Sequence, residues 1–186
     1  GKMTEARRQI EWELAAVQTS GFGQRIAARL HELARLEYDE GRYAHSEAAL
    51  AEALAIAESI DFRFIVALVL CQMGHTAAIQ GKPEAAGFYR RALEIAREQG
   101  MNGIVVDVIQ GVAGLAAQGG DVTNAVEWLA LAASHPNGEW ETKQKARKAL
   151  TELEGRLSAE EFSSAQVRGQ SAALETVIPS VLARLA

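Results

Sequence analysis

One pattern of small and large side chains recurs along this chain at steps of about forty residues. Its clearest copy is Ala85, Tyr89 and Ala92, with the spacing Ala-x3-Tyr-x2-Ala. The recurrence predicts an array of like units, each of which buries its apolar face against its neighbours. The other copies are Ser46, Leu50 and Ala53; Ala125, Leu129 and Ala132; and a partial copy at Ala6 and Ile10.

Helices account for nearly all of the chain in this interpretation. Only three prolines occur, and the alternation of apolar and polar residues that is typical of strands is missing. Glycine-containing breaks delimit ten expected helices, and Pro83 falls in the first turn of one, where its missing N–H costs nothing. The breaks within each pair are short, which favours antiparallel hairpins. The expected ranges are about 4–18, 24–40, 43–59, 62–80, 83–99, 104–118, 122–134 and 139–156, followed by two shorter helices.

Pairs that end in a small residue recur one helix upstream of the main pattern. They are Leu33-Ala34, Met73-Gly74 and Ala113-Gly114. We expect these positions to mark the closest approach of neighbouring helices, because a larger side chain would hold the two axes apart.

The end of the chain departs from the repeat, and we expect it to cap the array, because terminal units of an array are atypical. Trp140 is expected on the apolar stripe of the helix over 139–156, and Trp12 and Trp128 are also expected to be packing anchors. Ser158 followed by Glu161 predicts a capping box. The predicted organisation is a half repeat at 4–20, repeats at 22–60, 61–100 and 101–134, and a helical cap over 135–186.

The helix pairs between residues 6 and 134 resemble the tetratricopeptide repeat, chiefly through Ala85, Tyr89 and Ala92. The first helices keep the small residue of that motif and lack its bulky Trp and Tyr. The period of about forty, against about thirty-four in the family, is typical of its long-helix branch. The resemblance implies an all-α, right-handed α-solenoid of stacked antiparallel hairpins.

The chain from about residue 129 resembles the end of the helical sensor arm of large bacterial signal-transducing ATPases and related regulators. The segments that carry this likeness are Leu129-Ala130-Leu131-Ala132 with His135-Pro136, Leu150-Thr151-Glu152-Leu153-Glu154, and residues 162–185. The resemblance implies a sensor arm without the ATPase, since no Gly-x4-Gly-Lys-Ser/Thr motif is present.

The composition argues against several classes of partner. A formal charge of −5 and a pI near 5.5 disfavour a nucleic acid or an anionic membrane, because both require a concentration of Lys and Arg. The longest apolar stretch, 64–71, is too short to span a bilayer. Cys71 is the only cysteine, so an intramolecular disulfide and a cysteine-rich zinc site are excluded and a reducing cytoplasm fits best.

The tetratricopeptide frame places a candidate partner site on the concave face of the first helices. His31 and His75 would lie there, and Arg35 could bind an anion. Cys71 and His75 could alternatively form a catalytic nucleophile–base pair, since residues four apart are adjacent on a helix. A non-catalytic role is favoured for Cys71, as a small buried apolar side chain. His45 and His135 are expected to be solvated. The predicted concave-face residues are His31, Arg35, Tyr38, Leu68, Cys71, His75, Val108 and Leu115.

These observations predict a non-enzymatic interaction or sensor module that binds a peptide or protein partner and needs no cofactor or metal. Two alternatives remain open: an arm that binds a small-molecule effector through His31, Arg35, Tyr38, Cys71 and His75, and a structural or oligomerisation spacer. The first helix matches the second helix of a repeat and has no partner helix before it. Its apolar face could therefore mediate a homodimer, and a monomer is the alternative.

Overall fold

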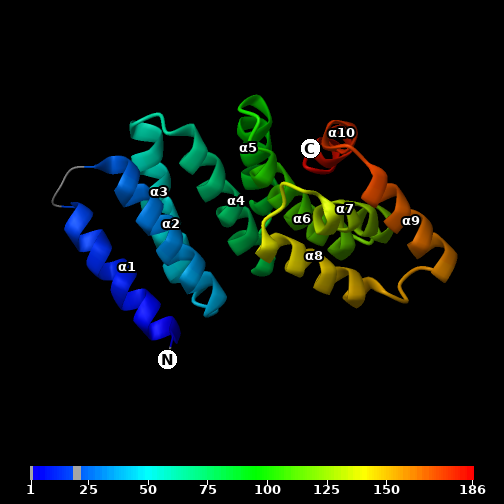
Figure 1. Cartoon of the computed structure of the whole chain (residues 1–186), viewed down its shortest axis with the longest axis horizontal. Helices are drawn as coiled ribbons and strands as arrows, with labels where there is room; N and C mark the ends of the chain where they lie inside the picture. Colours follow the sequence, from blue (N-terminus) through cyan, green and yellow to red (C-terminus); the bar gives the residue numbers. More distant parts are fainter. Residues whose placement is uncertain (1, 19–21) are drawn as a thin grey trace. The chain divides into compact units, whose positions relative to one another are not determined.

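In the computed structural model, which describes residues 2–18 and 22–186, all regular secondary structure is helical (Figure 1). The prediction of an all-α chain with ten helices is confirmed for these residues. The helices are α1 (Lys2–Gln18), α2 (Gly23–Asp39), α3 (Tyr43–Ser59), α4 (Arg63–Ile79), α5 (Ala85–Glu98), α6 (Asn102–Gln118), α7 (Val122–Ser134), α8 (Trp140–Leu153), α9 (Ala159–Ser171) and α10 (Leu174–Arg184).

The chain divides into two compact units, residues 1–85 and residues 86–186. In the first, consecutive helices from α1 to α4 pack side by side (Figure 1), and α2 also packs against α4. In the second, α7 packs against α6, α8 and α9, while α6 also contacts α8 and α10. Each unit therefore has its own core.

Five helices end in the same backbone motif at steps of about twenty residues, half of the sequence period. Each has a residue with positive φ, followed by a residue whose N–H donates to the carbonyl five positions back, as in a Schellman motif. The positive-φ residues are Gly41, Asp61, Gly81, Gly100 and Gly120, with φ from 51° to 86°. The second bonds join Arg42 to Glu37, Phe62 to Ala57, Lys82 to Ala77, Met101 to Ala96 and Asp121 to Ala116, at 2.8–2.9 Å.

This motif makes the reversals short, because in four of the five cases its last residue is already the N-cap of the next helix. The four are Arg42, Phe62, Met101 and Asp121. Glycine suits four of the positive-φ positions because it lacks the Cβ that makes a left-handed conformation costly. Asp61 is the exception, with a φ of 51°.

Close contact between α5 and α6 depends on Gly111. A Cβ on this residue would lie 2.5 Å from Cζ of Tyr89, whose side chain is fully buried. Tyr89 is the large residue of the recurring pattern, so the absent side chain on α6 gives its ring space. Gly169 has a similar role between α9 and α7, where a Cβ would lie 2.9 Å from Cβ of Ala130.

Several local features bear on the sequence predictions. The capping box at Ser158 and Glu161 is confirmed, as is the burial of Trp128. α5 begins at Ala85, after a turn that contains Pro83, so the expectation that Pro83 lies in its first turn is wrong.

The predicted packing of two tryptophans is wrong. Trp12 is 72% exposed and Trp140 is 73% exposed. The reason is helical phase: two residues span about 200° of a helix, so Trp140 lies opposite the buried Thr142, and Trp12 lies opposite the half-buried Ile10 and Leu14. The buried face of α8 consists instead of Thr142, Ala146, Leu150 and Leu153.

Two glycines of α6 provide a matched pair for testing this packing. Gly111→Ala should lower the free energy of unfolding by about 2 kcal/mol, because the buried Tyr89 ring must move. Gly114→Ala should raise it by about 0.5–1 kcal/mol, because a Cβ there meets nothing within 4 Å and alanine favours the helix. Urea denaturation of both variants measures the difference, and equal effects would contradict the assigned Tyr89 contact.

The positive-φ residues give a second prediction. Asp61→Gly should stabilise the chain by about 0.5–1 kcal/mol, because glycine adopts this conformation without Cβ strain. Gly41→Ala, at the corresponding position after α2, should destabilise it by about 1 kcal/mol. Thermal unfolding followed by circular dichroism would measure both, and a destabilised Asp61→Gly variant would show that the Asp61 side chain has a stabilising contact of its own.

Candidate functional site

The predicted partner-site residues of residues 1–85 lie on two helices that pack together. His31, Arg35 and Tyr38 follow one face of α2; His31 is buried, while Arg35 and Tyr38 are half-buried. The Tyr38 ring lies 5.7 Å from that of Tyr43 on α3, tilted by 59°. The α2 part of the predicted site therefore offers mainly Arg35 and Tyr38 to a partner.

On α4 the structure brings Cys71 and His75 together and leaves Leu68 half-buried. Cys71 Sγ lies 3.5 Å from His75 Nε2, as their spacing predicted. Cys71 is 1% exposed and His75 is 9% exposed, which confirms the interpretation of Cys71 as a small buried residue.

The last two predicted residues, Val108 and Leu115, lie on α6 in residues 86–186. Val108 is fully buried and Leu115 is half-buried. Four residues of the predicted site are half-buried and so expose appreciable surface area to a partner: Arg35, Tyr38, Leu68 and Leu115.

A cluster of four charged side chains joins α1, α2 and the start of α3. The Glu37 carboxylate is nearly buried and forms ion pairs of 2.5 Å with both Arg7 and Arg42. The same two arginines also pair with Glu40. The two positive and two negative charges balance, and a carboxylate as buried as Glu37 requires such partners. The cluster therefore attaches α1 to the rest of residues 1–85.

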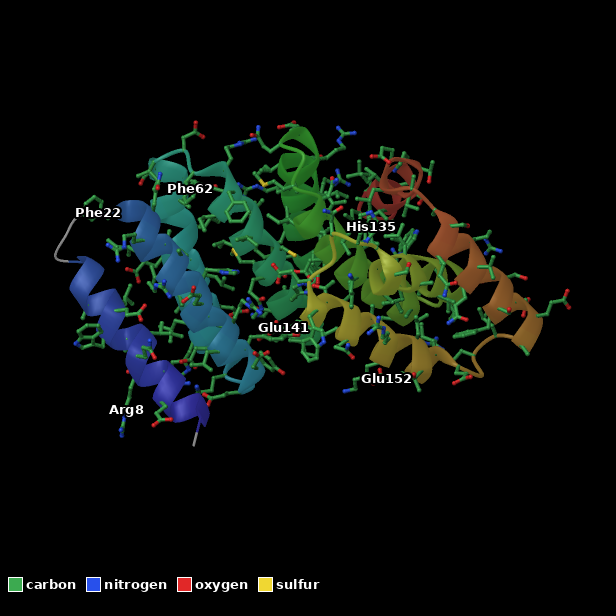
Figure 2. The ribbon with its side chains drawn as sticks, viewed as in Figure 1. Arg8, Phe22, Phe62, His135, Glu141 and Glu152 are labelled. Atoms are coloured by element: carbon green, nitrogen blue, oxygen red, sulfur yellow. The ribbon has the colours of Figure 1, made fainter. Side chains whose placement is uncertain are left out.

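Large apolar side chains gather around the turn at Asp61. Ile60 packs near Gly23, since a Cβ on Gly23 would meet its side chain at 3.4 Å. The rings of Phe62 and Phe64 are 6.3 Å apart, and Figure 2 shows Phe22 and Phe62 at the same end of this unit. Phe22 is 59% exposed, Phe64 45% and Ile60 41%. We call Phe22, Ile60, Phe62 and Phe64 the Phe64 patch.

The other four reversals show that the backbone does not require this apolar character. At the position of Ile60 they carry Glu40, Gln80, Gln99 and Gly119, and at the position of Phe64 they carry Ala44, Glu84, Gly103 and Thr123. Single exposed apolar residues are ordinary on protein surfaces. Three exposed large apolar residues, Phe22, Ile60 and Phe64, at or near one of five equivalent turns make this turn a candidate contact surface.

Residues 86–186 contain a pocket of about 290 Å³ between α6, α7 and α8. Its floor is formed by small and aliphatic residues: Gly114, Ala117, Leu129, Ala149 and Leu153. Its mouth carries three polar side chains, Gln118, Glu152 and Arg156; Figure 2 labels Glu152 on α8. The Arg156 guanidinium donates through Nη2 to the Ala117 carbonyl at 3.2 Å.

The sequence pattern does not reveal this pocket, because in that pattern Gly114 indicates a close approach of helices. That prediction is wrong at Gly114, where a Cβ would have no atom within 4 Å. The glycine instead leaves open space in the wall of the pocket. At Gly111, three residues earlier on α6, the Tyr89 side chain fills the space that a Cβ would occupy.

His135 lies half-buried in the turn between α7 and α8 (Figure 2), whereas we expected a solvated side chain. Its Nδ1 accepts a hydrogen bond from the Asn137 backbone N–H at 3.2 Å, so the neutral ring carries its proton on Nε2. Burial lowers the pKa of His135 below 6.5, the positive charge of Lys143 lowers it further, and Glu175 opposes both. His45 is exposed, as expected.

Comparisons with protein-family models, curated proteins and solved structures found no match to this chain. Among the described residues, none of the helices has the length and apolar character needed to cross a membrane. Function is therefore inferred from the surfaces of the molecule itself.

His135 should make stability depend on pH. Because its pKa is lower in the folded chain than the unfolded value of 6.5, the unfolded state binds more protons below that pH. The contribution of neutral His135 to stability is complete above pH 6.5 and is lost as the pH falls through the pKa that His135 has in the folded chain. Urea denaturation at a series of pH values from about 7.5 down to 5.5 should show a shallower decline for His135→Asn than for the wild type.

The matched control for this prediction is His45→Asn, which alters an exposed histidine on α3. This variant should retain the wild-type pH dependence. A steeper decline for His135→Asn would mean that the folded chain favours protonated His135, contrary to the burial and the Lys143 charge.

Proposed function

We propose that this chain is a non-enzymatic interaction module that binds a peptide or protein partner. The observation that carries the proposal is the Phe64 patch, where large apolar side chains surround one of five equivalent helix reversals. Binding surfaces between proteins are centred on large apolar anchors that lose their water on contact. Phe22, Ile60 and Phe64 offer such anchors and have exposed area to bury.

The repeated construction supports the same function. Arrays of helical hairpins present extended surfaces, and their known uses are dominated by recognition of other chains. We infer a right-handed α-solenoid similar to the tetratricopeptide repeat, acting as a sensor arm in a larger bacterial signalling protein of the cytoplasm. The recurring positive-φ turns and the contact of α2 with α4 support this arrangement within residues 1–85.

The charge pattern indicates the chemistry of the partner. With a net charge of −5, the chain would repel a polyanion over most of its surface. An apolar peptide segment with large side chains suits the Phe64 patch, since its burial would supply the binding free energy without basic residues. The concave partner face expected from the sequence adds a second surface, to which Arg35, Tyr38 and Leu68 of residues 1–85 contribute half-buried side chains.

A selection of displayed random peptides on the immobilised chain would test this function. We expect enriched peptides to contain large apolar residues, and Phe64→Ser should weaken their binding about tenfold or more, the scale of a hot-spot residue. Fluorescence anisotropy with a labelled peptide measures the dissociation constant. Val167→Ser is the matched control, because it removes another exposed apolar side chain, on α9.

Tyr38→Ala separates the two surfaces. If it weakens binding while Phe64→Ser does not, the partner lies on the predicted face of α2 and the assignment to the Phe64 patch is wrong. If no peptide is enriched, or if both variants bind like the wild type, the proposal that this chain recognises peptides fails.

A further inference from the structure

We infer that the pocket between α6, α7 and α8 binds a small molecule with an apolar body and one anionic group, such as an aryl or alkyl carboxylate. This site goes beyond the proposed partner binding. It lies wholly in residues 86–186, whereas the Phe64 patch lies in residues 1–85, so either assignment can fail alone.

The shape of the pocket sets the size of the ligand. Pockets for drug-sized molecules start at about 300 Å³, and a cavity of about 150 Å³ already accommodates benzene. A volume of 290 Å³ therefore suits one ring with a short chain. Leu129 and Leu153 are buried, and Gly114 adds open space beside them. An apolar body placed there would lose its water against the aliphatic floor.

The charges at the mouth favour an anion. Arg156 lines the mouth and donates through Nη2 to the Ala117 carbonyl. A guanidinium has five N–H donors, so the same side chain can also bind a carboxylate. Glu152 lies at the same mouth, but Lys148 sits 3.8 Å from its carboxylate and offsets its charge. Of the side chains that line the mouth, Arg156 and Glu152 carry opposite charges, and Glu152 already pairs with Lys148 outside the pocket, so Arg156 is the group that would attract an anion.

A second arginine adds positive potential at the same end of α6. Arg184 of α10 donates through Nη2 to the Leu115 carbonyl at 3.4 Å. Two guanidinium groups thus contact carbonyls in the last turns of α6, which would otherwise present the negative end of the helix dipole. Their positive charges offset the negative end of the helix dipole, which would otherwise disfavour an anionic ligand near this end of α6.

Gly114 allows the pocket to be filled without disturbing its walls. In Gly114→Leu the added side chain should occupy the ligand volume, because Cβ meets nothing within 4 Å. Gly87→Leu is the matched control: Gly87 lies in α5, is exposed, and likewise has no atom within 4 Å of an added Cβ. Both variants replace a helical glycine with leucine, so they share the gain in helix propensity.

The experiment titrates the nitrogen-15-labelled full chain with phenylacetate, phenylacetamide and phenethylamine, which present negative, neutral and positive groups on similar bodies. Phenylacetate should bind with a dissociation constant of the order of 1 mM, as expected for so small a ligand. Its amide shifts should centre on Gly114 and Ala117. Phenylacetamide should bind about fivefold more weakly, and phenethylamine more weakly again.

The variants separate the pocket from its charge. Gly114→Leu should weaken phenylacetate binding at least about tenfold, while Gly87→Leu should bind like the wild type. Arg156→Gln, which alters an exposed side chain and so should still fold, should remove the preference of the wild type for phenylacetate over phenylacetamide. If no probe binds at about 10 mM, if the shifts centre elsewhere, or if Gly114→Leu binds like the wild type, the site is refuted. Equal binding of the three probes would refute its anion preference.

Discussion

The left-handed residue that ends five of the helices is the constraint on which the rest of this structure depends. It lets the chain reverse within about two residues while the last carbonyls of the helix still accept hydrogen bonds. Because the final residue of the turn is usually also the next N-cap, consecutive helices are held close to one another. The small residues at their contacts, such as Gly111 opposite Tyr89, then decide how closely they pack.

Local patterns made much of the fold predictable from the sequence. Helix ends fell within about three residues of their expected positions, because glycines and caps act through the backbone next to them. The same logic identified the capping box at Ser158. The prediction that Trp12 and Trp140 pack in the core failed, because it relied on their apolar character and not on their position around the helix. Phase is the stronger evidence for a helix that buries only one face, since a residue two positions away points to the opposite side.

The candidate sites were harder to predict because they depend on distant parts of the chain. Arg7 and Glu37 are thirty residues apart and pair only when α1 packs on α2. The pocket depends on what stands opposite Gly114, and sequence alone does not distinguish it from Gly111, where the space is filled. The Phe64 patch is different, because the apolar character of its turn is visible in the sequence once the five turns are aligned on Asp61 and the four equivalent glycines.

The turn at Asp61 departs from the local rules in two independent ways. It has the only positive-φ residue other than glycine within the described part of the chain, and it exposes Ile60 and Phe64 where the equivalent turns carry polar or small residues. Neither feature is needed to reverse the helix, as the four other turns demonstrate. Departures from local consistency tend to concentrate where function imposes a further requirement. Two such departures at one turn therefore favour recognition at the Phe64 patch over a purely structural role for these side chains.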